Sequence, residues 1–175
     1  KQPDFTKPDR EYTVQIRRRD PSDVSTLTEL KVYDTDDKQL TLSPAFTAAQ
    51  SDYTLRVPFS TSKIRASVKP QEDSVSRIFA VYGRRGQSDY KKWKTVDINP
   101  DGSISKDIPV DFITAAYDHD EIWIVVGSEM AYGYTEQELI KMVIDGDKSE
   151  YVSVYRIRVE RAEPSDDATL KSLVI

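Results

Sequence analysis

The sequence predicts an all-β protein, an antiparallel β-sandwich that carries one short inserted helix. Apolar and polar residues alternate in short segments, and turn residues separate these segments at a spacing of about ten residues. Hydrophobic residues make up 38% of the chain, and the strand-forming residues Val, Ile, Thr and Tyr are plentiful. Only one segment, near the C-terminal end, has helical periodicity instead. This combination is typical of two packed sheets.

The alternating segments are the predicted strands, and a turn or a proline ends most of them. Their ranges are 12–16, 27–32, 40–42, 53–57, 64–68, 78–82, 96–98, 104–110, 122–126 and 152–159. The turn Asn99-Pro100-Asp101-Gly102 is predicted to close a hairpin, with Gly102 at the position that tolerates positive φ. Ile122–Val126 is apolar at every position, so it is predicted to be the most buried strand.

A short helix is predicted over residues 135–144. Thr135 followed by Glu138 forms a capping-box pattern, and Gly146 ends the apolar stripe that follows,. The side chains expected to pack this helix are Leu139, Ile140 and Val143. The large residues predicted to form the sandwich core are Leu30, Leu55, Val57, Val81, Trp123, Val125, Ile157 and Val159.

One pattern occurs twice: Tyr12–Val32 returns as Tyr155–Ile175, with eight identical positions around a shared Pro-Ser-Asp core. A strand, a short breaker and another strand is the pattern expected between tandem domains. We therefore predict that residues 1–25 are a lead-in and the last strand of a preceding repeat. Residues 26–161 would be one complete sandwich, and residues 162–175 a linker and the first strand of a following repeat. The alternative is a chance resemblance between two edge strands.

The predicted end strands raise a question of partners. Each connection between them and the sandwich is short and contains a proline, which predicts a restricted angle between repeats. Without its own sheet, each end strand is expected either to fold against the sandwich or to pair with the ends of other molecules.

Composition excludes several functional classes. The net charge of −5 argues against nucleic acid as a partner, and no apolar run is long enough for membrane insertion,. The dense basic cluster Arg17–Arg19 lies beside acids and is interpreted as a solvated junction. The absence of cysteine excludes thiol chemistry and cysteine-bound metal, and it points to a bacterial surface protein or to the cytosol,.

Several motifs, taken together, resemble the bacterial cadherin-like β-sandwich domain. They are Leu27-x-x-Leu30-x-Val32, Leu42-Ser43-Pro44-Ala45-Phe46, Tyr53-x-Leu55-x-Val57-Pro58, Ile64-x-Ala66-x-Val68, Val81-Tyr82-Gly83, Ile122-x-Ile124-x-Val126 and Tyr155-x-Ile157-x-Val159-x-Arg161. The resemblance implies an immunoglobulin-like, non-catalytic extracellular module that forms tandem repeats in secreted or surface-attached bacterial proteins. The loop Arg84–Lys94 and the insertion Ala131–Glu150 depart from the family pattern, so we expect any special function there.

Two aromatic motifs have structural interpretations that do not depend on the family. Pro44 cannot donate to a ladder and must end a strand or lie at an edge. Phe46 is expected to close one end of the core. Tyr53 offers a hydroxyl that can bond to the backbone, as corner tyrosines do in sandwiches.

Catalysis finds little support in the sequence. His119 is the only histidine, it lies among carboxylates, and no serine has a nucleophile-elbow context,. Asp118 and Asp120 could in principle act as acid and base, but neighbouring turn carboxylates are usually only solvated. We therefore predict no catalytic residues and no enzyme activity.

Calcium is the cofactor that the acidic turns could hold, although no cofactor is the expected state. The candidate ligands, all hard oxygen donors, are Asp34, Asp36, Asp37, Asp97, Asn99 and Asp101,, with Asp118, Asp120 and Glu121 in a further acidic turn. The stretch from Asp97 begins like an EF-hand loop but places Ile108 where the bidentate acid should be.

Two functions remain open. The first is a structural spacer or adhesin-stalk repeat whose partners are the neighbouring repeats. The second is an accessory module that binds a glycan or a surface protein through aromatic residues in the two non-family segments: Tyr90, Trp93, Tyr132 and Tyr134. Coplanar exposed rings would favour binding, and buried rings would favour the spacer.

Overall fold

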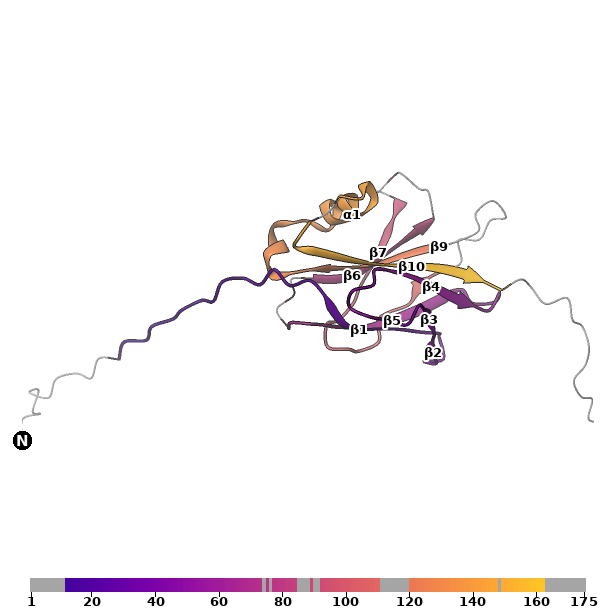
Figure 1. The fold of residues 1–175 in the computed structure, drawn as a ribbon, viewed down its shortest axis with the longest axis horizontal. Coiled ribbons are helices and arrows are strands. Elements are labelled where there is room, and N and C mark those ends of the chain that lie inside the picture. Colours follow the sequence, from indigo (N-terminus) through magenta and orange to yellow (C-terminus); the bar gives the residue numbers. More distant parts are fainter. Residues whose placement is uncertain are drawn as a thin grey trace, which may run out of the picture.

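The computed structural model describes residues 12–73, 75, 77–84, 89, 92–110, 120–147 and 149–162. These residues form two packed sheets and one α-helix, as the sequence predicts (Figure 1). The first sheet has four strands in the order β2-β1-β5-β8, and the second has six in the order β3-β4-β10-β9-β6-β7.

The bounds of most strands follow the predicted segments, but of the predicted strand 104–110 only Ile108–Pro109 forms a strand. The first sheet contains β1 (Leu27–Tyr33), β2 (Gln39–Leu40), β5 (Lys63–Pro70) and β8 (Ile108–Pro109). The second contains β3 (Leu42–Ser43), β4 (Asp52–Val57), β6 (Arg77–Arg84), β7 (Lys94–Asp97), β9 (Asp120–Gly127) and β10 (Val152–Arg161). A 3-10 helix, η2 (Glu129–Gly133), and the helix α1 (Glu136–Asp145) lie between β9 and β10.

Two details of the topology differ from the prediction. Strands β4 and β10 pair in parallel, whereas the other strand pairs are antiparallel. The turn at Asn99–Gly102 does contain a positive φ at Gly102, but it does not close a hairpin. Its flanking strands β7 and β8 belong to different sheets, so the chain crosses from one layer to the other there. A local turn pattern cannot distinguish these two paths.

The main core lies between the sheets and contains the inward faces of both. All eight large residues predicted for the core are buried, but only five lie between the sheets. Val81, Trp123 and Val125 are buried instead on the outer face of the six-stranded sheet. Tyr53 acts as the expected corner tyrosine, because its hydroxyl donates towards the carbonyls of Thr47 (3.0 Å) and Gln50 (2.7 Å). Burial raises the pKa of Tyr53,. Phe46 packs against the rings of Tyr53 and Tyr155 at the edge of this core.

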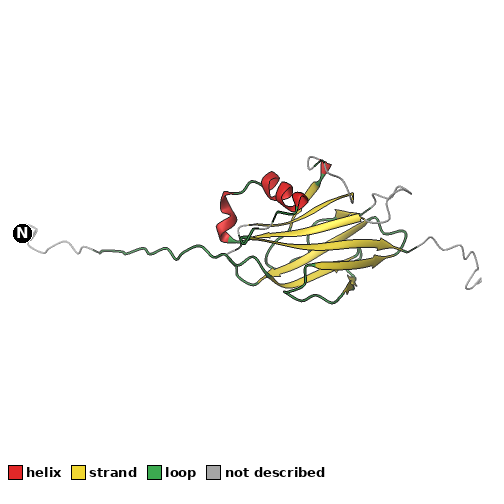
Figure 2. Ribbon diagram, turned by 45° about the horizontal axis from the view of Figure 1, so that its top comes forward, coloured by secondary structure: helices red, strands yellow, loops and turns green. Residues whose placement is uncertain are grey.

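A second apolar cluster lies on the outer face of the six-stranded sheet, where α1 covers it (Figure 2). Its buried members are Phe79, Val81, Trp93, Trp123, Val125, Leu139, Ile140 and Val143. Strand β9 therefore buries both of its faces, one in each cluster. This confirms the prediction that Ile122–Val126 is buried throughout.

The helix α1 begins and ends as predicted. The Thr135 hydroxyl accepts a hydrogen bond from the Glu138 N–H (3.3 Å), and the Glu138 carboxylate accepts one from the Thr135 N–H (2.7 Å). These two bonds complete the capping box,. The Glu138 carboxylate also accepts a hydrogen bond from the Thr135 hydroxyl (2.7 Å). The bonds that it accepts from the Thr135 N–H and hydroxyl lower the pKa of Glu138, because they favour its ionised form,. Gly146 ends the helix in the left-handed conformation, with φ of 74°,.

The segment 12–18 differs from the prediction of a half-buried strand. It forms no strand in this chain, and its apolar side chains are 79% (Tyr12), 79% (Val14) and 85% (Ile16) exposed. Figure 1 shows the arm extending away from the sandwich. The arm therefore does not fold back on its own sandwich, and the pairing option remains a prediction. The second end strand, 170–175, lies outside the described residues.

Candidate domain-junction interface

The duplicated pattern corresponds to two real strands of the sandwich. Tyr155–Arg161 is the C-terminal part of β10, and Leu27–Val32 is most of β1. In β10 the apolar positions Tyr155, Ile157 and Val159 point into the core and are buried. Their counterparts in the arm are Tyr12, Val14 and Ile16, whose exposed side chains have the pattern of a core-facing strand.

The linker between the arm and β1 is held against the sandwich by η2. The Glu129 carboxylate pairs with the Arg19 guanidinium (2.9 Å) and accepts a hydrogen bond from the Ser22 N–H (3.1 Å). The Met130 N–H donates to the Ser22 carbonyl (3.1 Å), and the Val24 N–H donates to the Ser22 hydroxyl (3.1 Å). Both the N–H and the carbonyl of Ser22 are thus bound, which fixes the direction in which the chain enters the sandwich.

The local chain path explains why Glu129 stands at this place. Strand β9 ends at Gly127, and the Ser128 N–H donates to the Tyr151 carbonyl next to β10 (2.9 Å). Ser128 is extended and caps η2, so Glu129 occupies the first turn of that helix. A carboxylate is favoured there, close to the unpaired N–H groups of a helix start.

The first residues of β1 are fixed to β10 at the same end of the sandwich. The hydroxyls of Ser25 and Ser153 share a hydrogen bond (2.8 Å), and the Leu27 N–H donates to the Tyr155 hydroxyl (2.8 Å). Burial of the Tyr155 ring raises its pKa, which keeps the hydroxyl neutral,. The linker is therefore anchored from Arg19 to the start of β1.

Two predicted ligand-binding tyrosines lie on this same corner. Tyr132, in η2, is 81% exposed, and Tyr134, which follows η2, is 40% exposed. The pKa of Tyr151 is raised mainly by its hydrogen bond to Glu150, with further effects of the charge of Asp23 and of Tyr134.

The opposite end of the sandwich is where β10 leaves it. The Ala162 N–H donates to the Val57 carbonyl (2.9 Å) and extends the ladder one residue beyond β10. Arg161 donates to the carbonyls of Phe59 (3.1 Å) and Val110. Phe59 lies in the turn between β4 and β5 and is 49% exposed. An apolar ring therefore stands beside the exit point of the chain.

Trp93, another of the predicted ligand-binding aromatics, does not join Tyr132 and Tyr134. Trp93 is only 5% exposed and stacks on Trp123, with ring centroids 4.4 Å apart and planes 19° apart. Its face is used in the cluster under α1, which gives no support to Trp93 as an exposed stacking platform. Tyr90 lies outside the described residues.

Two acids of the predicted calcium turn 34–37, Asp34 and Asp37, are bound within the protein. Asp34 accepts hydrogen bonds from the N–H groups of Asp36 and Lys38, both 2.9 Å long. Asp37 pairs with Arg65 at 2.7 Å. These contacts explain the turn as a structural element.

The second predicted calcium stretch is held in a similar way. Asp101 accepts a hydrogen bond from the Ser103 N–H (2.8 Å), and Asn99 donates to the Ser103 hydroxyl (3.3 Å). Contacts with Ser103 lower the pKa of Asp101. Asp97 lies 3.3 Å from Arg77. Within the described ranges, no three Asp, Glu or His side chains gather as a metal site.

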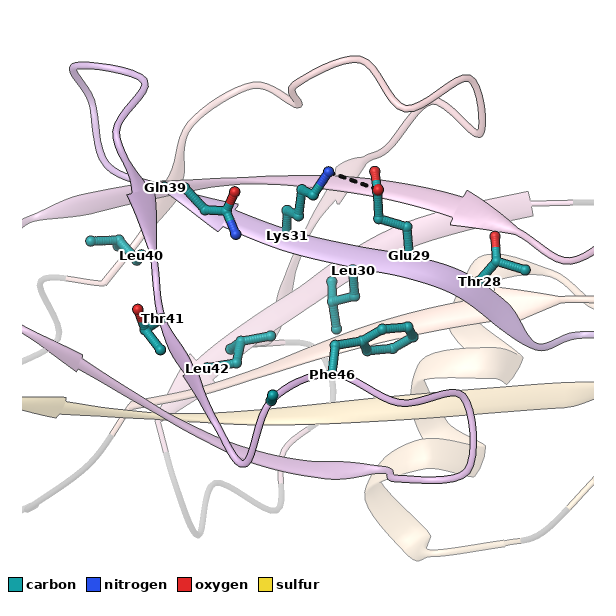
Figure 3. A pocket seen from close by; sticks show the side chains of 10 residues that line it. Thr28, Glu29, Leu30, Lys31, Gln39, Leu40, Thr41, Leu42 and Phe46 are labelled. Atoms are coloured by element: carbon teal, nitrogen blue, oxygen red, sulfur yellow. Dashed lines mark hydrogen bonds and ion pairs between the residues drawn. The ribbon is translucent and has the colours of Figure 1, made fainter.

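One small hollow opens between the two sheets beside β1, with a volume of about 260 Å³. Leu30, Leu42 and Phe46 line its floor, and Glu29 pairs with Lys31 at its rim (2.7 Å; Figure 3). The hydrogen bond from Lys31 lowers the pKa of Glu29. The rim therefore presents a mutually neutralised ion pair above apolar core side chains.

The side chains that could act as acid and base lie outside the part of the chain that the structure describes. Asp118 and His119 lie outside the described residues, as does the side chain of Asp120. Glu121 is in β9, where it pairs with Gly83 and Arg158. Among the described residues, no helix is long and apolar enough to span a membrane.

Sequence reasoning missed Glu129 and η2 as parts of the junction. The repeated Pro-Ser-Asp core did mark Ser22 as a junction residue, but nothing in the sequence around Glu129 signals that it binds a segment more than a hundred positions earlier. The chain matches no protein-family model, and no curated protein matches it significantly. The resemblance to cadherin-like domains therefore depends on the quoted motifs alone.

Proposed function

We propose that this chain is one repeat of a tandem array and acts as a non-catalytic spacer or stalk module of a secreted or surface-attached bacterial protein. One observation carries the proposal. The duplicated pattern coincides with the strands through which a chain enters and leaves the sandwich, β1 and β10, and these points lie at opposite ends of the molecule (Figure 1). Repeats joined in this way would form a row.

The anchored linker supports a stiff row rather than a flexible string. Contacts with the body of the sandwich hold Arg19, Ser22 and Ser25. Few linker residues are therefore free to change the angle between two repeats. Inter-domain motion is expected where few contacts cross a boundary. Here the boundary segment itself belongs to the folded unit.

The duplicated pattern also makes a direct test possible, because it defines how two copies of the chain can be fused without a foreign linker. Residues 1–161 of one copy can be followed directly by residues 19–175 of a second, which keeps the register of the shared pattern. We expect two folded sandwiches and, in small-angle X-ray scattering, an elongated particle that is longer than the single chain by about one sandwich. A compact particle, or one unfolded copy, would contradict the proposal.

A second function is favoured by the exposed ring of Tyr132. Together with Tyr134 it could stack on a glycan, since sugars bind to exposed aromatic faces. A glycan array probed with the single chain and with Tyr132→Ala would test this function. Binding that Tyr132→Ala abolishes would favour an accessory ligand-binding module over the spacer.

A further inference from the structure

We propose that the end of the sandwich formed by η2 is a docking surface for the preceding repeat, with Tyr132 packing against the turn between β4 and β5 of that repeat. The proposal deepens the proposed function, on which it rests, by naming the two surfaces that would meet at each junction. The partner is a homologous sandwich that presents an apolar ring at the position of Phe59.

The main argument is that Arg19 has two roles at once. In the duplicated pattern Arg19 corresponds to Ala162, whose N–H extends the ladder of β10 by bonding to the Val57 carbonyl. By equivalence, the backbone of Arg19 is the last ladder residue of the preceding sandwich. Its guanidinium is already bound to Glu129 of this sandwich (2.9 Å). The two bodies would therefore be joined by the Arg19 side chain and by the two residues Asp20 and Pro21, which precede the anchored Ser22.

The same equivalence tells which part of the preceding repeat arrives there. Arg18 corresponds to Arg161, which donates to the carbonyl of Phe59 in the turn between β4 and β5 (3.1 Å). Arg18 would bind the matching turn of the preceding repeat. That turn would then lie near Glu129, because Arg18 would bind the turn and the adjacent Arg19 binds Glu129.

The end of the sandwich formed by η2 presents an exposed aromatic side chain, Tyr132, against which such a turn would pack. Tyr132 is two residues beyond Met130, whose N–H binds the Ser22 carbonyl, and three extended residues from Arg19 to Ser22 span only about 10 Å. Tyr132 is 81% exposed in this chain. Phe59, at the other end, is 49% exposed. The junction would cover both rings, as large exposed aromatic residues at interfaces commonly are.

The in-register tandem of residues 1–161 and 19–175 tests this docking. Residual dipolar couplings report whether two domains share one orientation, and we expect both sandwiches to fit a single alignment tensor. Substituting Tyr132→Ser in the second copy, or Phe59→Ser in the first, should abolish the shared tensor, because each removes one side of the contact. Glu129→Ala in the second copy should also loosen the pair, because it frees Arg19 and Ser22.

The tandem contains its own matched controls. Tyr132→Ser in the first copy and Phe59→Ser in the second alter the same residues at ends that face no neighbour, so the shared tensor should persist. The folding of each variant is checked by the amide spectrum of its own domain. Rings that are simply needed for folding would disturb both copies alike.

The outcomes separate the two proposals. If the junction-side and outward-facing substitutions leave one shared tensor equally intact, the docking surface is wrong, whereas the rod-like spacer stands. If the two sandwiches in the unsubstituted tandem tumble independently, both the stiff spacer and the docking surface are wrong. Loss of the shared tensor with the junction-side substitutions alone supports both.

Discussion

Replacing Gly83 with alanine should destabilise the protein because of a single close neighbour, the ring of Trp93. A Cβ atom at Gly83 would lie 2.6 Å and 2.7 Å from two carbons of that ring, well inside van der Waals contact. The ring has little room to retreat, because it stacks on Trp123 with centroids 4.4 Å apart and lies in the cluster under α1.

The expected cost follows from three opposing effects. Overpacking of a well-filled core typically costs about 1–3 kcal/mol. Weakening the tryptophan stack adds up to about 1.5 kcal/mol. Alanine is better than glycine inside a strand by about 0.5–1 kcal/mol, which offsets much of the second effect. The free energy of unfolding should therefore fall by about 1–3 kcal/mol.

Urea unfolding gives the free energy, and near-ultraviolet circular dichroism reports the stacked pair, since the chain has only two tryptophans. Gly133→Ala is the matched control, because no atom lies within 4 Å of a Cβ built there. Its stability should stay within about 0.5 kcal/mol of the parent. In a Trp93→Leu background, Gly83→Ala should cost less than it does alone. If Gly83→Ala leaves both stability and the tryptophan signal unchanged, the packing argument is refuted.

Three further predictions concern the helix cap, the junction and the surface charge. Thr135→Ala should lower the free energy of unfolding by about 1 kcal/mol, measured by urea unfolding against Thr135→Ser, which keeps the hydroxyl; equal losses for both would contradict the cap. Tyr155→Phe should cost about 1–3 kcal/mol, since it leaves the buried Leu27 N–H without its acceptor,; an unchanged midpoint would argue against that bond. The pKa of Asp107 is lowered chiefly by its hydrogen bond to Arg65, so its stabilising effect should be complete above the ordinary carboxyl pKa and disappear as pH falls through the lowered value. The stability difference between the parent and Asp107→Asn should therefore shrink in acid, and a difference independent of pH would exclude this account.

The candidate junction was only half visible in the sequence. The repeated pattern identified the segments on both sides of it, because core-facing apolar positions and a Pro-Ser-Asp breaker persist in the sequence of each copy. The binding partner of the linker could not be found in the same way. Glu129 is one of many acids in the chain, and only the path from β9 into η2 brings it to Arg19.

The sequence by itself determined most elements of the fold, although the alternating segment 12–16 forms no strand and η2 was not predicted. Alternation with period two predicts strands, and the spacing of Thr135, Glu138 and Gly146 predicts the helix and both of its ends, because these signals depend on neighbours within a few residues. Tertiary structure alone decided what depends on distant partners: the parallel pairing of β4 with β10, the crossing at Asn99–Gly102 between the sheets, and the burial of Trp93 under α1. The backbone of the Asn99–Gly102 turn suits a hairpin or a crossing between sheets equally well, and the ring of Trp93 suits a buried or an exposed site. Only packing against residues far away in the chain selects between these outcomes.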